Sequence, residues 1–282
     1  LTGEEVQLWE ANFGYSQNTH IIGINQPLGQ MYGYITEGLY QVSDFDYDAT
    51  TQTYTLKDGI PYAGDKANVK PGMWKFKNVD GSEDNKITEE DKTVIGNAYP
   101  KFYGGINNTF TYKDFDLSIF LTYSFGNDVL NATKLTNTKT ALQNKNVLAA
   151  ADSHNRWVLV NKSGELITDP QEMAEINRGK TVAAIYDNEV GDTYIHSWAV
   201  EDGSFLKLSN ITLGYTFPKK IIEKIGISKL RLYATGSNLL TWTKYSGFDP
   251  EVSTMGNGLT PGVDFGAYPK SRSFVFGINL AF

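Results

Sequence analysis

The last ten residues of the chain alternate between two kinds of side chain. Val275 apart, the odd-numbered positions from Ser273 onward carry small or polar residues. A period of two residues is that of a β-strand with two unlike faces, and ten residues is about the length of a tilted membrane-spanning strand. The stretch therefore predicts a two-faced strand that ends on its apolar side. Large apolar residues stand at every second position: Phe274, Phe276, Ile278, Leu280 and Phe282.

Four earlier segments repeat this alternation and predict further strands. Gly104–Tyr112 and Phe115–Phe125 are separated by Lys113-Asp114 and predict a hairpin of two membrane-length strands. The turn lacks the Asn-Gly pair that such hairpins favour, so this prediction depends on periodicity. Phe205–Phe217 and Leu230–Trp242 show the same pattern. Between them, Pro218 to Gly226 predicts a short amphipathic helical turn closed by glycine.

The rest of the chain gives weaker signals. Residues 1–30 lack clear periodicity and are interpreted as connecting structure, whereas Met31–Gln41 predicts a Tyr-rich strand. Trp74 to Lys77 is a short β-like run. Asp169-Pro170 predicts the start of a helix, because Asp caps N-termini and Pro suits the first helical position.

Connection lengths alternate along the chain. Lys113-Asp114 and Pro218–Ser228 are short, whereas residues 42–103, 126–204 and 246–272 are long. Outer-membrane barrels have short periplasmic turns and long extracellular loops, and a soluble sandwich has no reason to sort its loops this way. We therefore predict an all-β fold, an antiparallel transmembrane β-barrel segment in which 42–103 and 126–204 are long extracellular loops. An aromatic final residue is common in bacterial outer-membrane barrels and predicts a signal for their insertion machinery.

Composition limits the classes of protein. The 282 residues are 40% hydrophobic and 13% aromatic, with a mean hydropathy of −0.34. No apolar run approaches the ~20 residues of a membrane helix, and alternating barrel strands give this diluted signal. The absence of Cys excludes disulfides and thiolate metal sites. The net charge of −7 argues against nucleic-acid binding. The start at Leu1 and the lack of a signal peptide predict a processed or partial chain.

One acidic loop has the spacing of a calcium site. Ca²⁺ takes six to eight oxygen ligands, and alternate residues of a tight twelve-residue loop can supply them. Lys86 is acceptable at position 7, which donates a backbone carbonyl. Asn85 replaces the usual turn glycine, and Asn tolerates the left-handed conformation that this turn needs. The shorter Asp91 replaces the bidentate Glu at position 12. The alternative is a solvated acidic turn. The predicted ligands, at positions 1, 3, 5, 7, 9 and 12, are Asp80, Ser82, Asp84, Lys86, Thr88 and Asp91.

Little else in the sequence points to chemistry. The three histidines, His20, His154 and His196, are far apart in the sequence, and neither His-Glu-x-x-His nor Gly-x-Ser-x-Gly occurs. We therefore expect no enzyme activity and predict no catalytic residues. Three tryptophans could stack on sugar rings, but we expect loop packing for Trp157 and Trp198 and an interfacial anchor for Trp242. The substrate-binding residues are not identified by the sequence.

Several motifs in order resemble the C-terminal part of SusC/RagA-type TonB-dependent outer-membrane transporters. They cover the chain from about Gly29 to its end: Gly29–Tyr34, Asn78–Asp91, Val94–Asn97, Pro100–Gly105, Phe205–Tyr215, Asn238–Thr241, Tyr245–Glu251 and the Phe282 terminus. The resemblance implies that residues 1–282 are the last third of a plugged barrel of about 22 strands. The plug and the TonB-contacting segment would lie in the missing N-terminal part. The family's usual Asp-x-Asn-x-Asp-Gly loop supports the calcium prediction.

The same resemblance implies a function in the cell outer membrane. Such proteins import oligosaccharides or, in some members, peptides, with a SusD-like surface lipoprotein as partner and energy from the TonB complex. Two other classes remain open. A passive porin would share the barrel without needing a plug. A soluble β-sandwich carbohydrate-binding module would share the aromatic residues and the calcium loop.

Overall fold

A computed structural model of the chain describes residues 6–11, 13, 17–138, 146–186, 194–254 and 257–282. The fold is predominantly β, and the chain forms two compact units. Unit 1 comprises residues 1–97, 130–200 and 253–265, and unit 2 comprises 98–129, 201–252 and 266–282. Among the described residues, no helix has the length and apolarity needed to cross a membrane.

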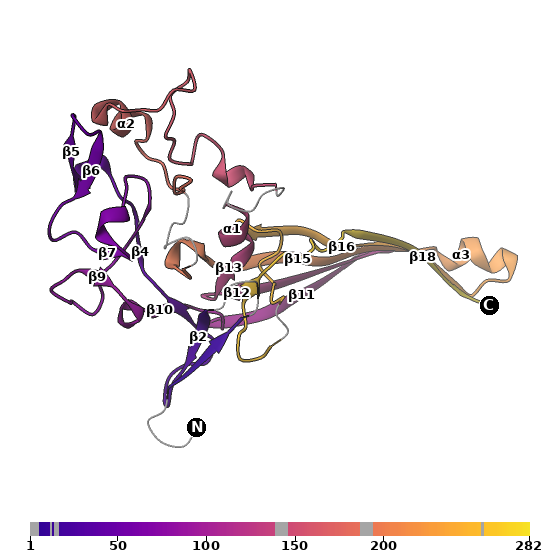
Figure 1. Cartoon of the computed structure of the whole chain (residues 1–282). Helices are drawn as coiled ribbons and strands as arrows, with labels where there is room; N and C mark the ends of the chain where they lie inside the picture. Colours follow the sequence, from indigo (N-terminus) through magenta and orange to yellow (C-terminus); the bar gives the residue numbers. More distant parts are fainter. Residues whose placement is uncertain (1–5, 12, 14–16, 139–145, 187–193, 255–256) are drawn as a thin grey trace. The chain divides into compact units, whose positions relative to one another are not determined.

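Unit 2 contains a sheet of five long antiparallel strands in the order β11-β12-β15-β16-β18 (Figure 1). Each long strand pairs with the one that follows it in the chain, so the sheet is a meander. All four alternating segments and the final stretch are confirmed as strands. Their bounds are β11 Phe102–Tyr112, β12 Phe115–Phe125, β15 Phe205–Thr216, β16 Lys229–Thr243 and β18 Ser273–Ala281.

The predicted hairpin has the predicted turn. Tyr112 pairs with Phe115 across Lys113-Asp114, and Lys113 has a positive φ of 55°. A β-bulge interrupts β15: Phe120 pairs with Asn210 and Leu121 with Leu208, which leaves Ser209 as an extra residue. The bulge explains why the apolar positions of β15 change parity, from Leu206 and Leu208 to odd numbers later in the strand.

The connection between β15 and β16 is the expected helical turn. It consists of α3 (Lys219–Ile222) and the 3-10 turn η7 (Glu223–Ile225). Gly226 ends it in the left-handed conformation, with φ 74°, which glycine adopts without steric cost.

Unit 1 begins with strands where we expected connecting structure, so that prediction was wrong. A four-stranded sheet has the order β1-β2-β3-β10. Strands of four or five residues are too short for alternation to stand out. Their bounds are β1 Gln7–Glu10, β2 Asn18–Ile22, β3 Gln30–Gly33 and β10 Thr93–Asn97.

The single strand predicted for Met31–Gln41 is also wrong, because the segment divides between two sheets. After β3 the chain continues as β4 (Thr36–Leu39), which pairs with β8 (Trp74–Phe76). Tyr34 lies between them: its N–H donates to the carbonyl of Ile195 and its carbonyl accepts from Ser197 N–H, both at 2.9 Å. This distant partner separates the two strands.

Residues 42–103 contain small elements instead of an unbroken loop, and they end inside β11. A short hairpin, β5-β6, and a parallel pair, β7-β9, are spaced by 3-10 turns. The bounds are η1 Val42–Asp44, β5 Phe45–Asp48, β6 Thr53–Leu56, β7 Tyr62–Ala63, η2 Lys66–Asn68, β9 Lys86–Ile87 and η3 Glu89–Asp91.

The connection 126–204 holds the short helices that we expected, although residues 139–145 and 187–193 within it lie outside the described part. Asp169 caps the predicted helix by accepting from Gln171 N–H, with Pro170 at its first position. The bounds, with the last short strand added, are β13 Asp128–Asn131, α1 Ala132–Asn137, η4 Ala149–Ala151, α2 Pro170–Ile176, η6 Ser197–Ala199, β14 Val200–Asp202 and β17 Val263–Asp264.

A buried apolar cluster in unit 1 joins segments that are far apart in the sequence. Trp157 is buried and packs against Gly72, where a Cβ would overlap the indole. Trp198 packs against the same cluster, so both indoles have the packing role that we expected. The buried members are Tyr34, Leu39, Trp74, Phe76, Ile87, Trp157, Ile167, Met173, Ala183 and Ala184.

Candidate functional site

The long sheet of unit 2 has one apolar face. Residues paired directly across antiparallel strands share a face, so the register defines rows that run across all five strands. Two of these rows are apolar from edge to edge. They are Tyr112, Phe115, Tyr215, Leu232 and Ile278, and then Phe110, Leu117, Leu213, Ala234 and Phe276.

The opposite face is mostly polar. Thr212 and Thr235 share a hydrogen bond between their hydroxyls (2.8 Å), and Ser237 donates to Asn210 Oδ1 (2.7 Å). Asp116 and Arg231 form an ion pair on this face (2.6 Å). Cross-strand pairing places apolar residues opposite apolar ones and polar residues mostly opposite polar ones. The whole sheet, and not only each strand, therefore presents one apolar and one polar surface. Trp242 pairs with Leu206 and extends the apolar surface toward the end of β16.

The predicted calcium loop lies in unit 1, between β8 and β10. Asn85 takes the left-handed conformation that we expected of it, with φ 56°. Its carbonyl accepts from Tyr62 N–H (2.9 Å). Lys86 and Ile87 then form β9, and Ile87 enters the apolar cluster. The loop is therefore anchored to the core at its middle.

Asp91 closes the loop. Its carboxylate is fully buried and accepts three backbone N–H groups: Val79 (2.7 Å) and Asp80 (3.3 Å) on Oδ1, and Thr88 (2.8 Å) on Oδ2. Asp91 thus ties both ends of the loop together, a role that the spacing alone did not identify.

The other predicted ligands lie at the surface of the loop. Asp80 accepts from Ser82 N–H (2.8 Å), and Asp84 accepts from Lys86 N–H (3.0 Å). The Lys86 N–H, and after it the Ser82 hydroxyl, lower the pKa of Asp84, so this carboxylate is an anion near neutral pH. Thr88 Oγ1 accepts from Glu90 N–H (3.2 Å).

The donor set is that of a calcium loop, but the side chains are not gathered around one point. Within the described ranges, no three Asp, Glu or His side chains converge as metal ligands would. The loop supplies oxygen donors that suit Ca²⁺, and binding would require Asp80 and Asp84 to turn inward. The site therefore stays a prediction.

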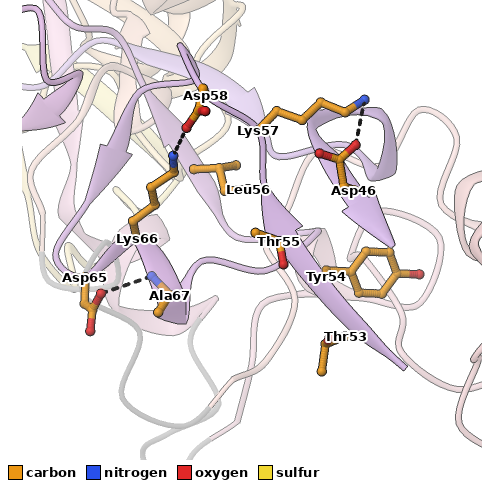
Figure 2. Close-up of a pocket in the computed structure, with 10 residues that line it drawn as sticks. All are labelled: Asp46, Thr53, Tyr54, Thr55, Leu56, Lys57, Asp58, Asp65, Lys66 and Ala67. Carbon is orange, nitrogen blue, oxygen red and sulfur yellow. Dashed lines mark hydrogen bonds and ion pairs between the residues drawn. The ribbon is translucent and has the colours of Figure 1, made fainter. Parts of the chain in front are cut away.

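A surface pocket lies on the β5-β6 hairpin and η2, a region to which the sequence assigned no site (Figure 2). Figure 2 shows Lys66 reaching Asp58 (2.6 Å) and Lys57 reaching Asp46 (4.0 Å). The lining mixes charged, hydroxyl and apolar side chains, and both of its lysines are engaged in ion pairs. The pocket is lined by Asp46, Thr53, Tyr54, Thr55, Leu56, Lys57, Asp58, Asp65, Lys66 and Ala67.

The three histidines have different surroundings. His20 is buried and binds Thr19 Oγ1 and the carbonyl of Pro261, both at 2.9 Å. His196 is buried beside Thr36 Oγ1 (2.6 Å) and the ring of Trp74 (centroids 4.8 Å apart). His154 is exposed near Asp152 (3.4 Å). Each has a local structural partner, and these contacts describe no shared catalytic arrangement.

Comparison with known proteins gives curated relatives and solved structures, whereas no family model matches. TonB-dependent receptor P3 of Formosa agariphila is 30% identical over 271 residues, which is 94% of this chain and 23% of that protein. TonB-dependent receptor SusC of Bacteroides thetaiotaomicron is 28% identical over 206 residues, 72% of this chain and 17% of SusC. The chain belongs to the SusC/RagA family of TonB-dependent receptors.

Solved structures agree on the fold of this SusC/RagA-family chain. A chain of the RagAB peptide transporter superposes with a TM-score of 0.61 at 22% identity, covering 94% of the present chain and 24% of its own. The RagAB peptide importer in its open-open state gives 0.60. The chain spans about a quarter of the length of these relatives.

Proposed function

We propose that this chain is the C-terminal part of an outer-membrane importer, and that its five long strands span the membrane. The observation that carries the proposal is the division of the sheet into one apolar and one polar face. Lipid cannot pair with backbone groups, so spanning strands must be hydrogen-bonded to neighbours and apolar on the outside. The apolar rows would face lipid, and the polar rows would line the interior of a barrel of about 22 strands.

The connections fit the same orientation. In the meander, the turns at Lys113-Asp114 and Pro218–Ser228 leave one end of the sheet, and the connections 126–204 and 244–272 leave the other. Short turns are periplasmic in outer-membrane barrels. We therefore propose that residues 42–103 and 126–204 lie outside the cell. The pocket on the β5-β6 hairpin would then be accessible to extracellular ligands.

The cargo of the whole receptor is proposed to be oligosaccharides or peptides. Support comes from the relatives, which include the SusC receptor and, among the solved structures, the RagAB peptide transporter. A SusD-like lipoprotein would bind the extracellular loops, and the TonB complex would supply energy through the rest of the receptor.

Uptake by cells tests this proposal. Cells with and without the full receptor gene would be given labelled oligosaccharides and labelled peptides, and accumulation measured. We expect deletion to abolish uptake of one class, and a protonophore to do the same in wild-type cells, because TonB-dependent import needs membrane energy. Uptake that survives the protonophore would instead indicate a passive porin. Recovery of the full protein in the soluble fraction would indicate a soluble carbohydrate-binding module.

We further propose that the loop from Asp80 to Asp91 binds Ca²⁺ as a structural ion. Two observations support it: Asn85 has the left-handed backbone that the loop requires, and Asp91 already closes both ends. Asp80, Ser82, Asp84, Thr88 and Asp91 would supply side-chain oxygens, and Lys86 its carbonyl. The ion would neutralise the carboxylates and stiffen the loop.

Limited proteolysis of the full receptor tests the calcium proposal. We expect Ca²⁺ to slow cleavage of residues 78–92, and Asp80→Ala with Asp84→Ala to remove that protection. The matched control is Glu83→Ala with Glu90→Ala, which removes two exposed carboxylates of the same loop that are not predicted ligands. Equal Ca²⁺ protection in both double variants would contradict the site.

A further inference from the structure

The connection between β15 and β16 is basic in an acidic protein. Between Pro218 and Arg231 the chain carries five cationic side chains and one anionic one, although its net charge is −7. The lysines are exposed, and within the described ranges none forms an ion pair. The cations are Lys219, Lys220, Lys224, Lys229 and Arg231. We call residues 218–229 the basic turn.

The basic turn also exposes apolar side chains. Ile222 is buried and holds the turn against the protein, whereas Ile221 and Ile225 are 60% and 69% exposed. Residues four apart lie on the same side of a helical turn, so the two exposed isoleucines form one small apolar surface. On an ideal helix Lys224 and Lys220 lie beside it on one side, at about 60° and 100° around the helix axis from Ile221.

This turn joins the sheet beside a further apolar pair. Phe217 N–H donates to the carbonyl of Leu230 (2.9 Å) where the turn begins and ends. Leu230 pairs with Leu280, in the same register as the apolar rows. The neighbouring turn emerges at the same end of the sheet, because Thr216 N–H donates to the carbonyl of Asp114 (2.8 Å). That turn adds Lys113, whose ammonium lies 5.3 Å from the ring centroid of the exposed Tyr112.

We propose that the basic turn binds the anionic head groups of phospholipids in the periplasmic leaflet, with Ile221 and Ile225 inserted among the first acyl carbons. The proposal rests on the membrane-spanning function proposed above. An amphipathic turn with lysines beside an apolar surface is the arrangement that lies in a membrane interface. Lysine stems run along apolar surface while their ammonium groups reach the phosphates.

Charge complementarity favours a lipid over a protein partner. The turn presents two aliphatic side chains and flexible lysines, which suit a fluid layer of phosphates better than a shaped protein surface. Each lysine near an anionic membrane strengthens binding about fivefold. Removing three of them should therefore weaken selective binding of anionic lipid by up to about a hundredfold at low salt, and less at high salt.

Lipid retention by the full receptor tests the proposal. Purified receptor would be mixed with phosphatidylglycerol or phosphatidylcholine in detergent, and bound lipids counted by native mass spectrometry. Wild type should retain phosphatidylglycerol selectively. Lys219→Gln with Lys220→Gln and Lys224→Gln should lose the selectivity, and Ile221→Ser with Ile225→Ser should reduce retention of both lipids. The matched control replaces three exposed lysines elsewhere, Lys101, Lys162 and Lys244, with Gln.

Three results would overturn the proposal: equal retention of the two lipids by wild type, selectivity that survives the triple Gln change, or equal loss in the matched control. A parallel arm offers lipopolysaccharide, and preference for it over phosphatidylglycerol would refute the periplasmic leaflet as the source. A failure of the transport proposal can be told apart from a failure of the lipid proposal, because lipid retention needs neither substrate nor TonB. Membrane insertion is measured separately, by flotation of the receptor with liposomes.

Discussion

Arg231 on β16 and Asp116 on β12 pair across an intervening strand. Arg231 Nε donates to Asp116 Oδ1 (2.9 Å) and Nη2 donates to Oδ2 (2.6 Å). Gly214 of β15 pairs with Asp116 on one side and Tyr233 on the other, whereas Arg231 pairs with Thr216, two residues along β15. A Cβ at Gly214 would overlap both the guanidinium and the carboxylate. Glycine at this position is what lets the two charged groups meet.

The first prediction concerns this glycine. Gly214→Ala should separate the pair and destabilise the receptor by about 1–3 kcal/mol, because the added methyl has no space and the charges lose their bidentate contact. Thermal unfolding of the purified receptor measures the change. Gly258→Ala is the control, since no atom lies within 4 Å of a Cβ built there. Equal stability of the two variants would show that the pairing of Arg231 with Asp116 does not need glycine at position 214.

The second prediction tests the two faces. Arg at Ile119 or Ile278 should destabilise the barrel by about 2–4 kcal/mol, because a charge would enter the middle of the lipid layer. Arg at the adjacent Ser118 or Asn279 should be milder, since these residues lie on the polar face. Unfolding in lipid vesicles compares each pair. Similar losses at both parities would contradict the assignment of the apolar face to lipid.

The third prediction concerns Lys207, which is buried between two carboxylates. It lies 2.8 Å from Glu251 and 3.7 Å from Asp249, with a side chain only 4% exposed, whereas Lys270, which contacts the same two carboxylates, is 44% exposed. Lys207→Met should destabilise by about 1–3 kcal/mol, since it leaves the buried carboxylate of Asp249 with one cation fewer. Lys270→Met should cost less because water replaces its contact. The order of the two midpoints of thermal unfolding is the measurement.

The fourth prediction is a pH dependence from His20. Burial, partly offset by the hydrogen bond to the Pro261 carbonyl, lowers the pKa of His20 from 6.5 to about 4. Above pH 6.5 the ring is neutral in both the folded and the unfolded state. As pH falls from 6.5 to about 4, the unfolded state binds a proton that the folded state rejects, so the free energy of unfolding decreases, by on the order of 3 kcal/mol.

Comparison of two variants isolates this effect. His20→Gln should flatten the loss of stability between pH 6.5 and 4, although it should also lower stability at pH 7 by disturbing the contacts of Thr19 and Pro261. His154→Gln is the control variant, because His154 is exposed. Melting temperature against pH is the readout, and an unaltered slope in the His20 variant would assign the pH dependence to other groups.

The sequence by itself determined those features that depend on near neighbours. Alternation is a local property, so β12 and β18 could be read from their own residues, and the Lys113-Asp114 turn followed from the gap between two alternating runs. The helix after Asp169 and the left-handed Asn85 also depend on the residue and its immediate surroundings. The spacing of six donors from Asp80 to Asp91 located a loop, and the structure gave that loop the backbone conformation expected at Asn85.

Only the tertiary structure decided what depends on distant partners. Tyr34 divides an apparently continuous strand because it bonds to Ile195 and Ser197. Asp91 closes its loop by accepting backbone N–H groups that spacing cannot assign. Arg231 meets Asp116 only because Gly214 has no side chain to fill the space between them. Register joins residues about a hundred positions apart, and one bulge at Ser209 shifts every later side chain to the other face. No local pattern contains that information, since many registers satisfy the same alternation.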